Sequence, residues 1–193
     1  MTKVLIDNGH GVKTAGKRSP DGRLLEGVYA REIARRLGGE LEERSVPYAL
    51  ITPEPDDTPL STRVYRANSL HRQNHGSTIL LSLHSDASAR SGWSDAMGFS
   101  VRLSQNASQR SKTLARCLYH AAEQRGIPVR KYNGDVVPWW PQNLAICRDT
   151  VMPAVLVEMS FHTNKEQVEW ALSPEGRAAI VGALTDAVCT FIL

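Results

Sequence analysis

The stretch from Val4 to Gly11, which reads Val-Leu-Ile-Asp-Asn-Gly-His-Gly, constrains the fold of this chain more than any other feature. Its first three residues are aliphatic, as in a buried strand. The chain then becomes polar, and two glycines flank His10 and let the backbone turn sharply. Because ligand sites in α/β proteins lie at the carboxyl ends of the strands, the stretch predicts that His10 lies at the edge of a sheet. Taken alone, a strand and a turn that happens to contain a histidine explain it equally well.

Strand-like and helix-like segments alternate along the rest of the chain. Apolar runs that favour further strands are Tyr48 to Thr52, Thr78 to Leu83, Gly98 to Leu103, Leu144 to Arg148 and Ala154 to Met159. Amphipathic segments that favour helices are Leu24 to Arg44, Leu60 to Gln73, Ser108 to Arg125, and the segment that opens at the capping pair Ser173-Pro174 and runs to the end. Such alternation is typical of parallel sheets covered by helices on both faces. We therefore expect one α/β domain over residues 1–193, with three αβα layers around a twisted, mostly parallel sheet.

Composition narrows the class of protein and of partner. An apolar fraction of 41% and a charged fraction of 22% are ordinary for a globular domain. The net charge of +3 comes without a dense Lys/Arg block, so we expect no nucleic-acid partner. No apolar run approaches the ~20 residues of a membrane span. Three widely spaced cysteines among apolar neighbours are expected to be reduced and buried, and Cys147 is expected in the core.

Ile127 to Gln142 is expected to be irregular, because prolines and glycine interrupt it throughout. Long irregular segments in compact domains often bind ligands or cover a site. Trp139 and Trp140 lie between prolines in this segment and are candidate substrate-binding residues, suited to a sugar face or to the alkyl part of a peptide. A plug in the core is an equally good interpretation. Our hypothesis is that one tryptophan contacts substrate and the other anchors the segment.

Three strand ends carry side chains that can bind or activate something, namely His10, His84 and Glu158. Glu26, at the start of the first helix, follows the loop that leaves His10 and can reach the same edge. Two histidines and a carboxylate are the ligand set of many catalytic zinc sites, in which water takes the fourth position. A further glutamate beside the metal can move the proton that hydrolysis requires. His162 is close to Glu158 in sequence, but we favour a role outside the site for it.

The ordered set of motifs resembles one known family. Ile-Asp-Asn-Gly-His-Gly comes first, then a glutamate at the start of the next helix, Arg63 with Ala67-Asn68, the run Ser-Leu-His-Ser-Asp-Ala at residues 82–87, and Pro-Ala-Val-Leu-Val-Glu at residues 153–158. In this order they resemble the zinc-dependent N-acetylmuramoyl-L-alanine amidases of bacterial cell-wall remodelling and phage endolysins. The resemblance covers essentially the whole chain.

The resemblance implies a site and a function. His10, Glu26 and His84 would bind one Zn²⁺ per chain, and Glu158 would be the catalytic base and acid. The implied reaction is hydrolysis of the amide between N-acetylmuramic acid and L-alanine, with peptidoglycan or muropeptides as the partner. Without a signal peptide, the chain is expected to be made in the cytoplasm and to act at the cell wall after release or export by another route. Zinc carboxypeptidase or endopeptidase activity on the stem peptide, and a non-catalytic module that binds wall fragments, are the alternatives.

Four residues depart from the family pattern. Asn8, Val12 and Asp86 stand where proline, glycine and asparagine are common, and Gly27 stands where a bulkier residue is expected. None of them is one of the implied ligands. Asp7 has two interpretations: it either orients His10 or is simply an acid at a strand end.

Overall fold

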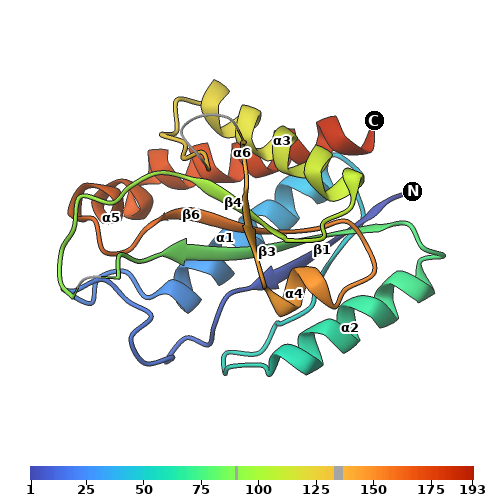
Figure 1. Ribbon diagram of the computed structural model, residues 1–193, viewed down its shortest axis with the longest axis horizontal. Coiled ribbons are helices and arrows are strands. Elements are labelled where there is room, and N and C mark those ends of the chain that lie inside the picture. Colours follow the sequence, from blue (N-terminus) through green and yellow to red (C-terminus); the bar gives the residue numbers. More distant parts are fainter. Residues whose placement is uncertain (90, 133–136) are drawn as a thin grey trace.

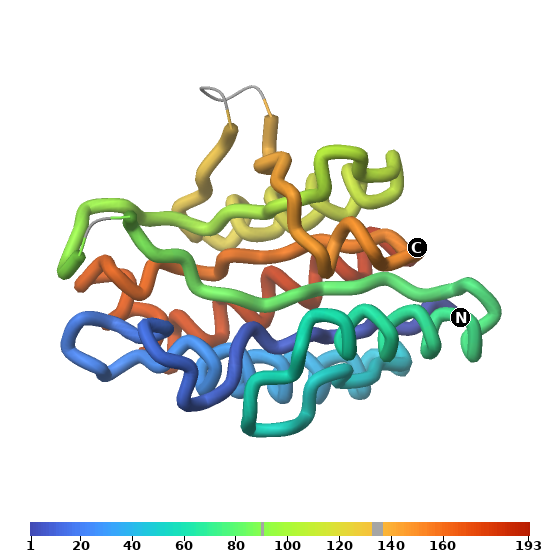
Figure 2. The backbone as a smooth tube through the Cα atoms, turned by 60° about the horizontal axis from the view of Figure 1, so that its bottom comes forward, coloured from blue at the N-terminus to red at the C-terminus, as the bar shows by residue number. Residues whose placement is uncertain are grey.

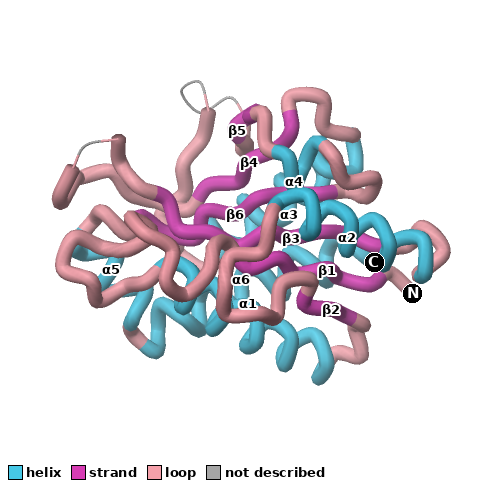
Figure 3. The backbone as a smooth tube through the Cα atoms, turned by 90° about the horizontal axis from the view of Figure 1, so that it is seen from below, coloured by secondary structure: helices cyan, strands magenta, loops and turns pink. Residues whose placement is uncertain are grey.

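A central sheet organises the computed structural model, which describes residues 1–89, 91–132 and 137–193. Within these residues the sheet has six strands in the order β2-β1-β3-β6-β4-β5, which Figure 3 shows from below. Neighbouring strands are parallel except for β4 and β6, which are antiparallel. The strands are β1 (Lys3–Asn8), β2 (Tyr48–Leu50), β3 (Thr78–Asp86), β4 (Ser100–Ser104), β5 (Trp140–Gln142) and β6 (Ala154–Phe161).

Helices cover both faces of this sheet. In Figure 1, α2 and α4 lie below the strands, and α3 and α6 lie above them. The helices are α1 (Glu26–Glu43), α2 (Leu60–Gln73), α3 (Gln109–Gln124), α4 (Ala145–Arg148), α5 (Lys165–Leu172) and α6 (Pro174–Ile192). The arrangement confirms the predicted α/β fold with three layers around a mostly parallel sheet. In the described part of the chain, no helix has the length and apolar character to cross a bilayer.

The two faces of the sheet differ in how much apolar core they bury. Val4 and Ile6 of β1 belong to the larger core cluster, which also contains side chains of α1, α3 and α6. Leu5 points to the opposite face, where a smaller cluster includes Ile146 of α4 and Ala67 of α2. Alternate residues of a strand face opposite sides, so one apolar run supplies both cores. The smaller layer leaves room on its face for the polar side chains near the strand ends.

The predicted elements agree with the structure except in one apolar run, one missed helix and one missed strand. Leu144 to Arg148 was predicted to be a strand, which is wrong, because residues 145–148 form the short helix α4. An apolar run this short has no periodicity that separates helix from strand, and here burial against β6 decides it. The helix α5 was not predicted. Trp140 to Gln142, in the segment predicted to be irregular, pairs with β4, and residues 133–136 of that segment lie outside the described residues.

Candidate active site

Strand pairing aligns polar side chains in rows across the face that carries α2 and α4. In one row Asp7 of β1 pairs with Ser82 of β3, followed by Leu156 of β6, Arg102 of β4 and Trp140 of β5. One row nearer the carboxyl ends, His84 of β3 pairs with Glu158 of β6. Directly paired residues in a sheet share a face, so these side chains are neighbours.

His10, Glu26 and His84 come together at the carboxyl ends of β1 and β3. One potential ligand atom from each lies within 4.8 Å of the other two. Glu26 Oε1 is 3.1 Å from His84 Nδ1 and 3.6 Å from His10 Nε2. The two imidazole rings meet edge to face, with their centroids 5.1 Å apart. The structure thus brings together the three residues that the sequence proposed as metal ligands.

The carboxylate of Glu26 supports a cation at this point. Its side chain is 1% exposed, and Oε1 accepts a hydrogen bond from the Ser85 N–H at 3.1 Å. The other oxygen, Oε2, is buried, and no hydrogen bond reaches it from the described residues. A buried, unpaired carboxylate oxygen is costly unless a charge compensates it. The two imidazoles lie nearest Oε1, and together with the carboxylate they offer the nitrogen and oxygen ligands that a divalent zinc ion prefers.

The pKa values of the three groups reflect their shared burial. Desolvation lowers the pKa of His10 to about 4, against the attraction of Glu26. A neutral imidazole is the form that binds a metal. Burial acts to raise the pKa of Glu26, but the hydrogen bond with His84 and the nearby histidines outweigh it and lower that pKa. Burial likewise acts to lower the pKa of His84, and the hydrogen bond with Glu26 reverses this and raises it.

His10 is held in a backbone conformation that L residues seldom adopt. Its φ is 55°, in the left-handed region. Arg31 of α1 donates to the His10 carbonyl at 2.6 Å, and Asp57 accepts from the Gly11 N–H at 2.7 Å. Strained backbone of this kind persists where the surroundings fix it, often at functional sites. These contacts fix the direction in which the His10 imidazole projects.

Gly27 has a steric reason to differ from the family pattern. A Cβ at Gly27 would lie only 2.2 Å from the Gly11 carbonyl oxygen, so the absence of a side chain lets α1 approach the loop that carries His10. We expect Gly27→Ala to lower the free energy of unfolding by about 1–3 kcal/mol, the range for overpacking. Helix propensity alone would favour alanine over glycine by about 1 kcal/mol. Denaturant unfolding measures the sign of the change.

The matched control is Gly39 in the same helix, where a Cβ meets nothing within 4 Å. Gly39→Ala is expected to raise the free energy of unfolding by up to about 1 kcal/mol. If Gly27→Ala is as stable as Gly39→Ala, the close approach to Gly11 does not limit this position.

Glu158 lies beside the candidate metal ligands, on the adjacent strand. Its side chain is 12% exposed, and Oε1 is 3.2 Å from Arg102 Nε. Oε2 is buried without a hydrogen bond from the described residues. Burial raises the pKa of Glu158 to about 7, although the charges of His84 and Arg102 oppose the shift. A carboxyl group that titrates near neutral pH can both accept and donate a proton there.

Two further basic side chains, His162 and Lys17, lie beside Glu26 and were not predicted as part of the site. His162 Nδ1 is 3.8 Å and Lys17 Nζ is 3.9 Å from Glu26 Oε2. His162 also bonds the Ser85 carbonyl at 2.9 Å, so it lies at the site, against the interpretation that we favoured from sequence. The sequence signal for His162 is its position directly after β6, because β6 and β3 are neighbouring strands and the site lies at their ends.

Asp7 makes contacts that belong to the end of β1. It forms a buried ion pair with Arg63 of α2 at 2.8 Å and accepts a hydrogen bond from Ser82 at 2.6 Å. Arg63 also donates to the Asn8 carbonyl. These contacts favour the strand-end interpretation, in which Asp7 ties β1, β3 and α2 together just before the chain reaches His10.

The side chains of Trp139 and Trp140 have different surroundings. Trp139 is half-buried against the larger core, and the Arg116 guanidinium lies 5.0 Å from its ring centroid. Trp140 pairs with Arg102, the neighbour of Glu158, and its Nε1 is buried without a hydrogen-bond partner in the described chain. Figure 2 shows residues 137–148 running past β4 into α4. The chain thus directs one tryptophan toward the core and the other toward the site.

A cavity of about 490 Å³ adjoins the candidate ligands. His10 and His84 line it together with apolar side chains such as Leu60 of α2 and Leu144 before α4. Mixed lining of this kind suits a ligand that is partly polar and partly apolar. The cavity gives a substrate access to the candidate metal ligands from the side of α2 and α4.

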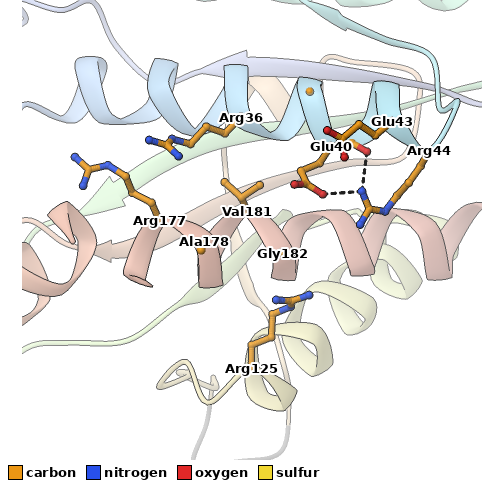
Figure 4. Close-up of a pocket in the computed structure, with 10 residues that line it drawn as sticks. Arg36, Glu40, Glu43, Arg44, Arg125, Arg177, Ala178, Val181 and Gly182 are labelled. Atoms are coloured by element: carbon orange, nitrogen blue, oxygen red, sulfur yellow. Dashed lines mark hydrogen bonds and ion pairs between the residues drawn. The ribbon is translucent and has the colours of Figure 1, made fainter. Parts of the chain in front are cut away.

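A second cavity, of about 450 Å³, lies between α1 and α6 and has a different character (Figure 4). Four arginines line it, and each has an acidic partner, so their charges are largely compensated. Surface ion pairs contribute little to stability or to binding, and of these four only the Arg177–Glu32 pair has both side chains partly buried. The pairs are Arg36–Glu32, Arg44–Glu40, Arg125–Asp186 and Arg177–Glu32.

Comparison with known proteins agrees with this geometry. A family model described as N-acetylmuramoyl-L-alanine amidase matches residues 4–190. No curated protein matches the sequence.

Solved structures with the same fold include several amidases. An N-acetylmuramoyl-L-alanine amidase from Clostridium difficile 630 has a TM-score of 0.85 at 21% identity, over 99% of this chain and 96% of that one. The amidase Ami1 from Mycobacterium smegmatis has a TM-score of 0.84 at 21% identity, with the same coverage of 99% and 96%. The catalytic domain of the CD27L endolysin targeting Clostridia difficile has a TM-score of 0.75 at 21% identity, over 98% of each chain. At these identities the likeness concerns the fold.

Proposed function

The chain belongs to the N-acetylmuramoyl-L-alanine amidase family, whose members hydrolyse an amide bond of peptidoglycan, and from this premise we propose a mechanism for it. One Zn²⁺ per chain is bound by His10, Glu26 and His84, and Glu158 carries the proton. The bond cleaved joins N-acetylmuramic acid to L-alanine. The observation that carries the proposal is the buried carboxylate of Glu26, whose Oε1 lies 3.6 Å from His10 Nε2 and 3.1 Å from Nδ1 of His84, the residue that pairs with Glu158 on the next strand.

Bound zinc would polarise the substrate carbonyl and lower the pKa of a water molecule. The proton transfers are carried out by side chains of this protein. Glu158 Oε1 faces Arg102, which leaves Oε2 to take a proton from the attacking water and to return it to the leaving amine of L-alanine. The surroundings that raise the pKa of Glu158 to about 7 suit both transfers.

Product analysis tests the bond that is cleaved. Digestion of purified cell wall, followed by mass spectrometry, is expected to give stem peptides that begin with a free L-alanine amine, together with glycan that has lost its peptides. Shortened stems on intact muramic acid would instead indicate a carboxypeptidase or endopeptidase. Binding without any product would indicate a module that only recognises wall fragments. Zinc removal by a chelator, with re-addition, is the control for metal dependence.

We also propose that Trp140 contacts the substrate and that Trp139 anchors its segment. Trp140→Ala is expected to raise KM for wall fragments several-fold with little change in melting temperature. Trp139→Ala is expected to cost about 2–3 kcal/mol of stability, below the ~3–5 kcal/mol of a fully buried tryptophan because Trp139 is half-buried. Kinetics and thermal unfolding of the two variants check both expectations. If both variants only melt earlier, with unchanged activity per folded molecule, the pair is a core plug.

A further inference from the structure

We propose that Arg102 is a positioning residue that orients the carboxylate of Glu158, and that Asp86 and Trp140 hold Arg102 in place. The inference rests on the proposed role of Glu158 as the proton carrier. Arg102 is on β4, and its side chain, 11% exposed, lies on the same face of the sheet as Glu158.

The contact between the two side chains involves one oxygen only. Arg102 Nε forms an ion pair with Glu158 Oε1 at 3.2 Å without hydrogen-bond geometry, and Oε2 keeps no hydrogen bond within the described chain. An ion pair at Oε1 favours those orientations of the carboxylate that keep Oε1 beside the guanidinium and direct Oε2 away from it. The direction of Oε2 matters because proton transfer requires the acceptor within hydrogen-bond reach of the attacking water.

Arg102 itself has two further partners, Asp86 and Trp140. Its Nη2 donates to the Asp86 carboxylate, and its guanidinium lies 5.9 Å from the ring centroid of Trp140. Arg130 lies 5.1 Å from the same centroid and 3.8 Å from Asp86. The planar guanidinium thus lies between two carboxylates, with a hydrogen bond to Asp86 and an ion pair with Glu158. Asp86, which departs from the family pattern, therefore serves to hold Arg102 in this cluster.

Arg102→Gln tests the proposal through the separation of kcat from KM. A displacement of about 1 Å at a catalytic group can lower rate by about 10²-fold. We expect kcat to fall by about 10- to 100-fold with KM changed less than two-fold, and with zinc content unchanged. Arg102→Lys retains the charge without the planar donors, and should recover part of kcat. A rise in KM at constant kcat would overturn the proposal and make Arg102 a substrate-binding residue.

The matched control is Arg116→Gln, which removes an exposed arginine stacked on the neighbouring tryptophan, Trp139. It should leave kcat and KM unchanged. If it lowers kcat as much as Arg102→Gln does, the effect comes from loss of arginine–tryptophan stacking and the proposal is overturned. Melting temperatures of all variants identify any that are poorly folded, and Arg102→Lys then carries the test.

A double-mutant cycle with Glu158→Gln decides whether Arg102 acts through Glu158. If it does, Arg102→Gln lowers kcat in the wild-type background and has no further effect in the Glu158→Gln background. Equal losses in both backgrounds would overturn the inference. The single variant Glu158→Gln tests the proposed function separately. Unchanged activity in that variant would show that Glu158 does not carry the proton.

Discussion

Replacing Glu158 by glutamine is expected to lower kcat on peptidoglycan by about 10²–10⁴-fold, the range that general acid–base catalysis contributes. Glutamine has the same shape but cannot accept a proton from water. The side chain is nearly buried and its Oε1 faces Arg102, so an amide oxygen can keep that contact. The fold and the zinc content are therefore expected to remain, and the loss should lie in the chemical step.

Three measurements on this variant separate the possible roles of Glu158. Steady-state kinetics on muropeptides give kcat, elemental analysis gives zinc per chain, and thermal unfolding gives stability. Glu43→Gln, at an exposed site on α1, is the control and should match the wild type. Turnover within a few-fold of the wild type would exclude the proton-carrier role. Loss of zinc would instead make Glu158 a ligand and displace Glu26 from that role.

The sequence predicted that His10, Glu26 and His84 come together, because the ends of strands can be recognised from the local residue pattern. Apolar runs end where the polar site begins, and parallel strands bring their carboxyl ends to one edge. His10 and His84 follow from this directly, and β3 extends only three residues beyond the predicted end at Leu83. Glu26 follows from the short distance along the chain to the next helix.

The parts that could not be predicted depend on contacts between distant segments. In the sequence, Arg102 is a single charged residue in an apolar strand. Only the antiparallel pairing of β4 with β6 places it against Glu158. In the sequence, Gly27 is simply a residue of low helix propensity. Its steric role is visible only in the structure, where the loop at Gly11 packs against it. His162 lies at the site because it hydrogen-bonds the Ser85 carbonyl of the neighbouring strand β3. Each depends on strand order or loop packing, which residue pattern does not encode.

Removing one histidine ligand should remove the zinc and the stability that comes with it. His84→Ala is expected to retain less than one tenth of the wild-type zinc after dialysis. A ligand that binds only the native state adds RT ln(1 + [L]/Kd), which is about 4 kcal/mol at ~1,000 Kd. Zinc should therefore raise the melting temperature of the wild type, and this rise should be absent from the variant.

The comparison with and without zinc matters more than the melting temperature alone. His84→Ala also takes the hydrogen-bond partner from the buried Glu26, so the metal-free variant should itself be less stable than the metal-free wild type. Only the zinc-dependent increment reports on metal binding. His120→Ala, at a side chain that is 63% exposed on α3, is the control and should keep that increment in full. Full zinc content in His84→Ala would contradict the assignment, because Glu26 and His10 would then need another partner to complete the site.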